Sequence, residues 1–185
     1  MDLIVLDQEL ETKYRQLQRR INRLQSGGTI DSMQQIGANT QNQIGASYVS
    51  LKKLASDYGT DEKLALLLWR SRKREQQIVA CFLLPKIINK EIITQLIESC
   101  SSFEISEYLG SVFLAEHAEL AEIATEWSNA DDPFRQTAAL TATARHLIVN
   151  KTNSLIPHSL LKELTEKKYT DQYVRLIAQR YRFNT

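Results

Sequence analysis

The fold is decided by the stretch from Asp61 to Pro85, DEKLALLLWRSRKREQQIVACFLLP. Residues 60–62, Thr-Asp-Glu, suit the start of a helix, and the apolar residues after them recur at the spacing of one helix face up to Trp69. A second helix pattern follows at once over residues 73–84 and stops before the proline. This stretch therefore predicts two short helices joined by a tight turn.

The same pattern continues in both directions along the chain. Apolar residues at every third or fourth position predict a first helix over residues 6–24, which the Ser-Gly-Gly of residues 26–28 ends, and a short helix over residues 29–36. Residues 37–47 are rich in Asn, Gln, Gly and Ala and predict a loop or a frayed helix. Further helices are predicted over residues 48–58, 88–100, 103–114, 117–128, 133–149, 158–167 and 170–183.

About ten helices joined by tight turns are typical of stacked helix pairs. We predict one all-α domain over residues 1–185, with antiparallel helix pairs stacked as a HEAT-like, ARM-type α-solenoid. An irregular helical bundle is the alternative. The composition agrees with either, because 6 Gly and 3 Pro leave few turn residues for an all-β fold.

The sequence predicts neither a metal nor another cofactor. Cys81 and Cys100 lack the spacing of a zinc or redox motif, and the three histidines, His117, His146 and His158, are scattered. The first residues have no basic segment before their short apolar run, and no stretch approaches the roughly 20 apolar residues of a membrane span. We therefore expect a cytoplasmic protein that does not enter a membrane.

Charge is distributed unevenly along the chain although its net value is only +1. Residues 1–80 contain 12 Lys and Arg against 9 Asp and Glu, residues 81–135 contain 3 against 10, and residues 136–185 contain 8 against 3. The two ends are therefore basic and the middle is acidic. A polyanion would be attracted to the ends and repelled by surfaces that the middle exposes.

The sharpest basic cluster lies at the turn between the two helices quoted above and contains Arg70, Arg72, Lys73 and Arg74. A contact with phosphate groups is the functional interpretation; solvated cations that complement a helix dipole are the structural one. The same two interpretations apply to a stripe of Arg15, Arg19, Arg20 and Arg23 on the first helix. Trp69 and Trp127 end apolar helix faces, where a place in the core is the simpler interpretation than base stacking.

Residues 64–80 fit the pattern LA-x-x-LW-x-S-x-x-x-E-x-x-x-x-A, and this segment resembles a signature of the AlkD-like DNA alkylation repair family. Other segments resemble elements of the same family in the same order: residues 45–55 upstream, and residues 109–114, 119–120, 127 and 138–139 downstream. The resemblance covers residues 30–150. It implies a concave stack of HEAT-like helix pairs that holds duplex DNA against a basic surface.

Active members of that family excise cationic N3- or N7-alkylated purines, with aromatic residues near the lesion and an Asp that stabilises the charge developing on the sugar. The resemblance places that Asp at Ser102, the Trp before it near Ile97 or Glu98, and a backbone-holding Arg at Thr137, with Arg135 close by. A register shifted by about five residues puts Phe103, Glu104 and Glu107 in the aromatic–acid–x–x–acid positions, so Glu104 and Glu107 are the candidate catalytic residues. Two carboxylates that complement the start of a helix are the structural alternative.

Three hypotheses about function follow. The first is a DNA-binding protein of the alkylation repair type with degraded or absent catalysis, which contacts DNA through Arg70, Arg72, Lys73, Arg74, Arg135 and Arg145. The second is a non-enzymatic scaffold that binds a protein partner along its concave face. The third is a glycosylase with a rearranged site.

Overall fold

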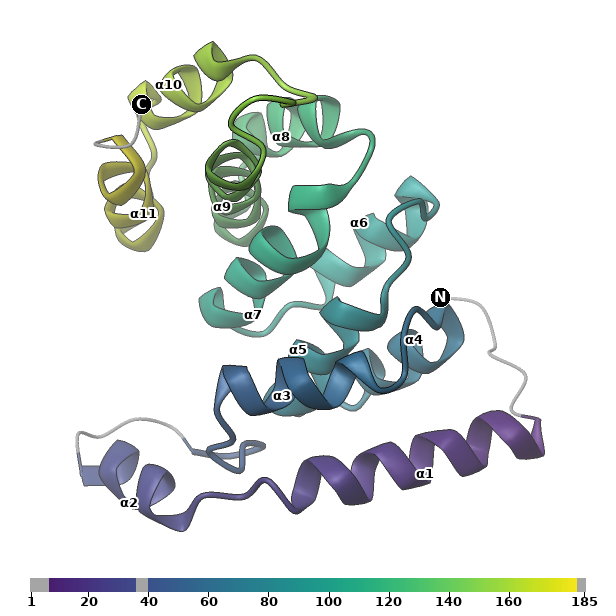
Figure 1. Cartoon of the computed structure of the whole chain (residues 1–185). Helices are drawn as coiled ribbons and strands as arrows, with labels where there is room; N and C mark the ends of the chain where they lie inside the picture. Colours follow the sequence, from purple (N-terminus) through teal and green to yellow (C-terminus); the bar gives the residue numbers. More distant parts are fainter. Residues whose placement is uncertain (1–6, 36–39, 183–185) are drawn as a thin grey trace. The chain divides into compact units, whose positions relative to one another are not determined.

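The computed structural model describes residues 7–35 and 40–182, and the chain divides into two compact units, residues 1–85 and residues 86–185. Every regular element in the described ranges is a helix, as Figure 1 shows. The predicted all-α class is therefore confirmed. The two units are described one at a time, and the single domain over residues 1–185 stays a prediction.

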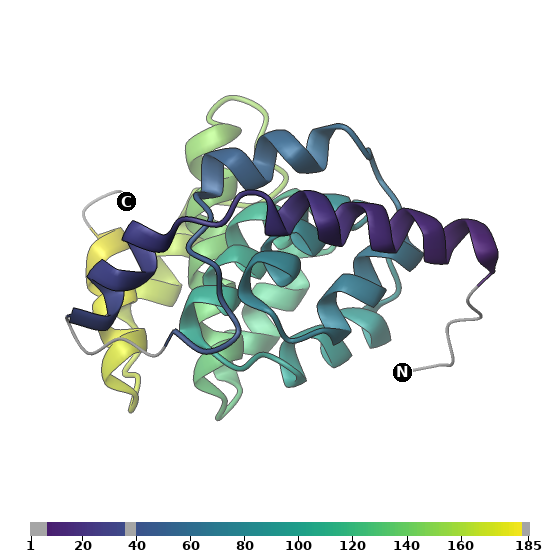
Figure 2. The same ribbon diagram turned by 90° about the horizontal axis from the view of Figure 1, so that it is seen from below.

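Unit 1 is built around the predicted helix pair. The pair consists of α4 (Glu62–Arg70) and α5 (Arg74–Leu83), which pack against each other. α1 (Gln8–Asn22) runs alongside α3 (Tyr48–Ser56), α4 and α5, as Figures 1 and 2 show, and α2 (Gly27–Gln35) follows α1 in the chain. The side chains of Leu17, Leu51, Leu64, Leu68 and Ile78 are fully buried and form the centre of this unit.

Side-chain caps start α1, α3 and α4 of unit 1. Asp7 accepts a hydrogen bond from the backbone N–H of Leu10 at 2.7 Å, and Asp61 caps α4 in the same way at 3.0 Å. The prediction that a short helix starts at residue 29 is wrong by two residues. Ser26 provides the cap instead, because its carbonyl accepts the N–H of Ile30 at 3.2 Å, and α2 therefore begins at Gly27. The last predicted residue of that helix, Ile36, lies outside the described residues.

The predicted loop is confirmed over residues 40–47, and residues 37–39 lie outside the description. A buried carboxylate fixes this loop, because Glu75 accepts the backbone N–H groups of Ile44 and Gly45, each at 3.1 Å. Gly45 has a φ of +72°, and a Cβ there would lie 2.9 Å from the carbonyl oxygen of Ser26. Only glycine suits both the backbone conformation and the space at this position.

Unit 2 is arranged around one long helix. That helix is α9 (Pro133–Val149), against which most of the other helical segments of the unit pack. Its predicted bounds are confirmed, because Asp132 accepts the N–H of Phe134 at 2.8 Å and a proline occupies the first turn. The other segments are α6 (Lys90–Glu98), α7 (Phe103–Tyr108), η1 (Leu109–Phe113), η2 (Leu114–Glu116), α8 (Leu120–Asn129), α10 (His158–Glu166) and α11 (Gln172–Arg182).

The segment after α7 approaches α9 very closely. A single α-helix was expected over residues 103–114, but α7 widens into a π-helical turn, η1, and then tightens into a 3₁₀ turn, η2. A Cβ on Gly110 would lie 2.6 Å from the carbonyl oxygen of Ala138. Glycine is therefore required at residue 110, because the backbones of η1 and α9 leave no room for a side chain.

Two buried histidines shape the remaining turns of unit 2. The ring Nδ1 of His117 accepts the backbone N–H of Glu119 at 3.2 Å, which explains why α8 starts at residue 120 rather than at the predicted residue 117. His146 lies 2.7 Å from the carbonyl oxygen of Ala115 through Nδ1, and its Nε2 accepts the N–H of Leu155 at 3.1 Å. Both histidines therefore have structural partners.

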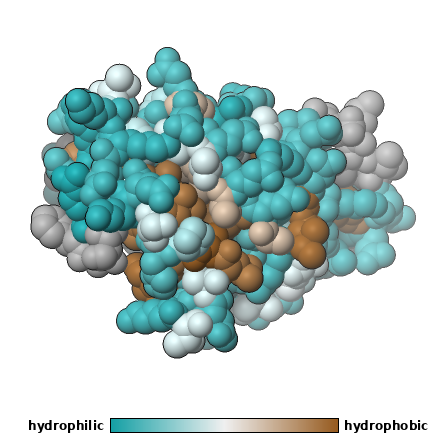
Figure 3. Space-filling view, turned by 90° about the horizontal axis from the view of Figure 1, so that it is seen from above, coloured by the Kyte–Doolittle hydropathy of each residue, from teal (hydrophilic) through white to brown (hydrophobic). Residues whose placement is uncertain are grey.

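Apolar side chains are exposed in a few places. Three of them, Ile148, Val149 and Leu155, lie at the end of α9 and in the loop after it. Figure 3 shows one face of the molecule, on which hydrophobic residues form a strip between hydrophilic ones. Among the described helices, none combines the length and the apolar character that crossing a membrane requires.

Candidate functional site

The predicted basic cluster lies at the turn between α4 and α5, and its members differ in their surroundings. Arg70, Arg72 and Lys73 are exposed. Arg72 has a φ of +55°, a left-handed conformation that is unusual for a residue with a side chain. The turn is closed by Ser71, whose hydroxyl donates to the carbonyl of Leu68 at 2.7 Å. Three cations therefore project from one tight turn.

Arg74 is different, because its side chain is only 20% exposed and faces the protein. Its Nη1 donates to the Glu75 carboxylate at 3.1 Å and to the Ala46 carbonyl at 3.3 Å. It therefore helps to hold the loop that Glu75 fixes. The interpretation as a DNA contact stays a prediction for Arg74, and these bonds give it a structural role as well.

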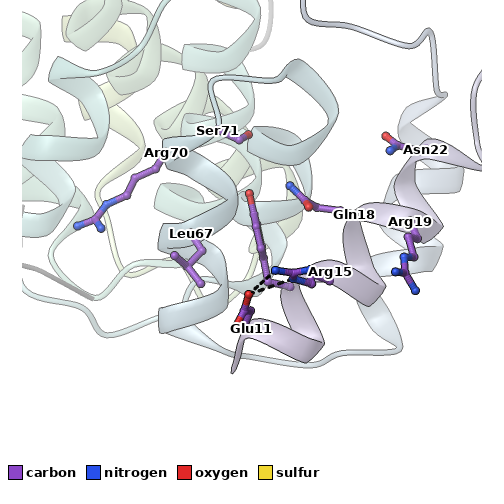
Figure 4. A pocket seen from close by; sticks show the side chains of 9 residues that line it. Glu11, Arg15, Gln18, Arg19, Asn22, Leu67, Arg70 and Ser71 are labelled. Carbon is purple, nitrogen blue, oxygen red and sulfur yellow. Dashed lines mark hydrogen bonds and ion pairs between the residues drawn. The ribbon is translucent and has the colours of Figure 1, made fainter. Parts of the chain in front are cut away.

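The fold brings part of the α1 stripe to the same cluster. An open groove of about 670 Å³ lies between α1 and the end of α4, and Figure 4 shows its lining. Arg15, Arg19 and Arg70 supply three cations to this groove, against one acid, Glu11. Glu11 accepts from Arg15 at 2.6 Å, whereas Arg19 has no ion pair in the described part of the chain. We call this the α1–α4 groove.

A second, smaller groove of about 290 Å³ lies on the other side of α1, against α3. Arg20, Arg23 and Lys53 line it together with one acid, Asp57, which pairs with Arg20. Arg20 also lies over the ring of Tyr58, 5.3 Å from its centroid. The arginine stripe of α1 is therefore a basic ridge between two basic grooves.

The two predicted DNA-contacting arginines of unit 2 lie on α9 in unlike surroundings. Arg135 donates to Glu98 at 2.8 Å and lies 3.6 Å from the Asp132 carboxylate, so two acids surround its positive charge. Arg145 is exposed and forms no ion pair with any residue that the structure describes. Acidic side chains therefore compensate the positive charge of Arg135, whereas the charge of Arg145 is available to a phosphate group.

A cluster of aromatic and charged side chains joins α7, α9 and α11 within unit 2. The ring of Phe103 stacks on Tyr173 with centroids 4.2 Å apart and meets Phe134 edge-on at 5.0 Å. Glu107 accepts hydrogen bonds from the Tyr173 hydroxyl and from Arg180 Nη1, the latter at 3.0 Å. Burial, followed by the hydrogen bond to Glu107, raises the pKa of Tyr173 to about 12. We call these five residues the Glu107 cluster.

The other candidate acid, Glu104, is exposed in the first turn of α7, as the dipole interpretation predicts. Ser102, where the resemblance predicts the family's Asp, is the N-cap of α7, because its Oγ accepts the N–H of Ile105 at 3.3 Å. Of the three residues that the shifted register puts in the family's aromatic and acidic positions, Phe103 and Glu107 belong to the Glu107 cluster and Glu104 does not. No sequence spacing indicated that Phe134, Tyr173 and Arg180 would be their neighbours.

Neither cysteine offers a reactive thiol. Cys81 and Cys100 are both buried, and burial raises the pKa of Cys100 to about 12, with the charge of Asp132 adding to it. Among residues 7–35 and 40–182 no three His, Cys, Asp or Glu side chains lie together in a way that would hold a metal ion.

A family model described as DNA alkylation repair enzyme matches residues 17–171 of the 185 residues. The chain belongs to this family. The fold of this family is a HEAT-like α-solenoid. The fold class predicted from the sequence is therefore confirmed. The chain matches no curated protein and no solved structure.

The segments that resemble the family turn out to be packing elements in this family member. Trp69 and Trp127 are each 1% exposed, so both are core residues rather than stacking platforms at the surface. Gly110 packs on Ala138, and Glu75 fixes a loop. The sequence indicated Arg15 and Arg19 but not that they line one groove with Arg70, and it gave no sign that α11 contributes to the Glu107 cluster; these residues lie outside those motifs.

Proposed function

We propose that this family member binds duplex DNA through the basic surface of unit 1 and that its base-excision chemistry is degraded or absent. The observation that supports DNA binding is the α1–α4 groove, whose lining includes Arg15 and Arg19 of one helix and Arg70 of another. Arginines recognise phosphate groups through several N–H donors, and cations from two elements can contact successive phosphates. The exposed Arg72 and Lys73 extend this surface.

The chemistry of the Glu107 cluster supports the second part of the proposal. Loss of an alkylated base leaves positive charge on the sugar, which the family meets with a carboxylate. Here the resemblance places Ser102 at that position, and its hydroxyl caps α7. The nearby carboxylate, Glu107, is bound by Tyr173 and Arg180, so its charge is already compensated. Loss of one such electrostatic contribution costs about 100- to 1,000-fold in rate.

Salt dependence tests the binding surface. We expect the affinity for duplex DNA, measured by fluorescence anisotropy between about 50 and about 200 mM salt, to fall as the salt concentration rises. The slope of the logarithm of the association constant against the logarithm of the salt concentration is proportional to the number of phosphate contacts. The double substitution Arg19→Gln and Arg70→Gln should reduce this slope by about 2, since each contact contributes about 0.9. Lys52→Gln with Lys63→Gln is the control, because it removes the same charge from exposed positions of the same unit. Equal slopes for both double variants would rule the groove out.

Release of N7-methylguanine from methylated duplex DNA tests the chemistry. We expect the wild-type protein to release little of this base, and Ser102→Asp to leave the fold intact, since Asp caps a helix as well as Ser. Glu104→Gln and Glu107→Gln complete the series. Robust release by the wild type that either Gln variant abolishes would contradict the proposal and identify that Glu as the catalytic carboxylate.

One set of contacts favours a protein-binding scaffold as the second candidate. Arg74 and Arg135 are engaged by Glu75 and Glu98, so two of the predicted DNA contacts are compensated internally. Cations of the acidic segment also form ion pairs within it: Lys90 lies 2.7 and 2.8 Å from two acids of α8, Glu122 and Glu126. Duplex binding that is absent at low salt would favour this candidate over the first.

A further inference from the structure

Helix α11 begins at Gln172, directly after the last residue that the family model matches. Tyr173, Ile177 and Arg180 recur at the spacing of one helix face. That face meets α7, because Tyr173 stacks on Phe103 at 4.2 Å and Arg180 binds Glu107 at 3.0 Å. Tyr173 also donates a hydrogen bond to Glu107, 66 residues earlier in the chain, and Arg180 lies 73 residues after Glu107. A helix outside the matched span thus supplies two of the five residues of the Glu107 cluster.

The body of α11 and its two contacting side chains are held very differently. Val174 and Ile177 are completely buried and Ala178 nearly so, which fixes the helix against its neighbours. The side chain of Arg180 is 54% exposed, whereas that of Glu107 is 23% exposed. A change of rotamer can therefore remove Arg180 from Glu107 while α11 stays in place.

Tyr173 and Arg180 supply an aromatic ring and a flat cation to the other residues of the Glu107 cluster, which are the same chemical groups that a flat cationic ligand would supply. Glu107 follows Phe103 by four positions on α7, and the side chain of Tyr173 contacts both the carboxylate and the ring. A carboxylate and an aromatic ring are a combination that attracts flat cationic groups. The guanidinium group of Arg180 is such a flat cation, and it binds the Glu107 carboxylate. The Tyr173 ring covers one face of Phe103. Helix α11 therefore fills the positions that an incoming flat cation would need.

We propose that Tyr173 and Arg180 form a side-chain cover over Glu107 and Phe103, which a flat cationic group on bound DNA must displace. The inference rests on the proposed function, since it requires that the protein binds DNA. It assigns a regulatory role to α11: the closed cover keeps the Glu107 cluster from distinguishing a cationic base from an ordinary one. Binding of phosphates at the α1–α4 groove does not depend on the cover.

The test compares affinities for two duplexes that differ only in one N7-methylguanine. We expect the full-length wild type to bind both almost equally. Arg180→Gln and Tyr173→Ala should each shift the ratio toward the methylated duplex, by about 2- to 30-fold, which is the range of a cation–π contact. Adding Glu107→Gln to Arg180→Gln should return the ratio to one. Lys162→Gln on α10 is the control, because it removes one exposed charge from the same unit.

Each outcome separates the cover from the proposed function. A ratio that stays at one in Arg180→Gln and in Tyr173→Ala, while both variants still bind DNA, overturns the cover and leaves the proposed function standing. A ratio that rises equally in Lys162→Gln overturns it as well. Failure of every protein to bind either duplex overturns both. Hydrogen exchange at the Val174 and Ile177 amides shows whether α11 remains docked, and exchange as fast as in an unfolded chain would exclude a cover made of side chains alone.

Discussion

Replacing Gly110 by alanine tests the closest packing contact of unit 2. The new Cβ would lie 2.6 Å from the carbonyl oxygen of Ala138 and 3.1 Å from its Cα, whereas ordinary contact begins at 3.4 Å. Both atoms belong to the backbone of α9, so no rotamer change relieves the overlap. Either η1 or α9 must move, and the buried side chains of Leu109 and Phe113 move with them.

The expected loss follows from two opposing effects. Overpacking of a close-packed interior costs about 1–3 kcal/mol, and movement of backbone places this site at the upper end. Alanine recovers about 0.5–1 kcal/mol, because it loses less conformational entropy than glycine in a helical segment. We therefore expect Gly110→Ala to lower the free energy of unfolding by about 2 kcal/mol, a fall in Tm of about 4–8 °C for a chain of this size.

The two tryptophans allow each unit to be followed separately. Trp127 lies buried in α8 of unit 2, and Trp69 lies buried in α4 of unit 1. In a Trp69→Phe background, urea unfolding measured by tryptophan fluorescence therefore reports on unit 2. Gly28→Ala, in α2 of unit 1 and with no atom within 4 Å of its Cβ position, is the control for the specificity of the assay and should leave the midpoint of unit 2 unchanged. Equal urea midpoints for Gly110→Ala and the parent protein would refute the close approach of η1 to α9.

Three further predictions concern single side chains. Glu75→Ala leaves the N–H groups of Ile44 and Gly45 without their buried acceptor, so we expect a loss of about 3 kcal/mol in urea unfolding and faster hydrogen exchange at these two amides. Arg72→Gly relieves a left-handed backbone conformation and should raise the free energy of unfolding by about 0.5–1 kcal/mol; a loss instead would show that the side chain stabilises the turn. Burial raises the pKa of Tyr169 to about 12, so its neutral form is favoured in the folded protein and the resulting stabilisation, complete below about pH 10, is lost as the pH rises through about 12. Alkaline unfolding of Tyr169→Phe should show a smaller fall in stability over that range, and an unchanged fall would assign the effect to other groups.

Local sequence signals predicted most of the helices in this chain. The start of α9 was predicted at residues 131–133 and its end near residue 149, and both agree with the structure, because Asp132 and Pro133 act within one helical turn of the start that they specify. Two of the errors have different causes, one local and one tertiary. His117 delays α8 by accepting a backbone N–H, and η1 replaces α-helix where Gly110 meets α9. Neither effect changes the apolar periodicity from which the helices were predicted.

The sequence by itself determined the helical class, the family, and the set of cations and acids available for function. Those properties depend on residue types and on spacings within a few turns of helix. The tertiary structure alone decided which of these side chains meet. Arg19 and Arg70 line one groove although 51 positions separate them in the sequence, and Glu107 contacts Arg180 of a helix 73 residues later. Such meetings depend on how helices pack, and packing is set by the summed contacts of buried faces, which no local pattern records.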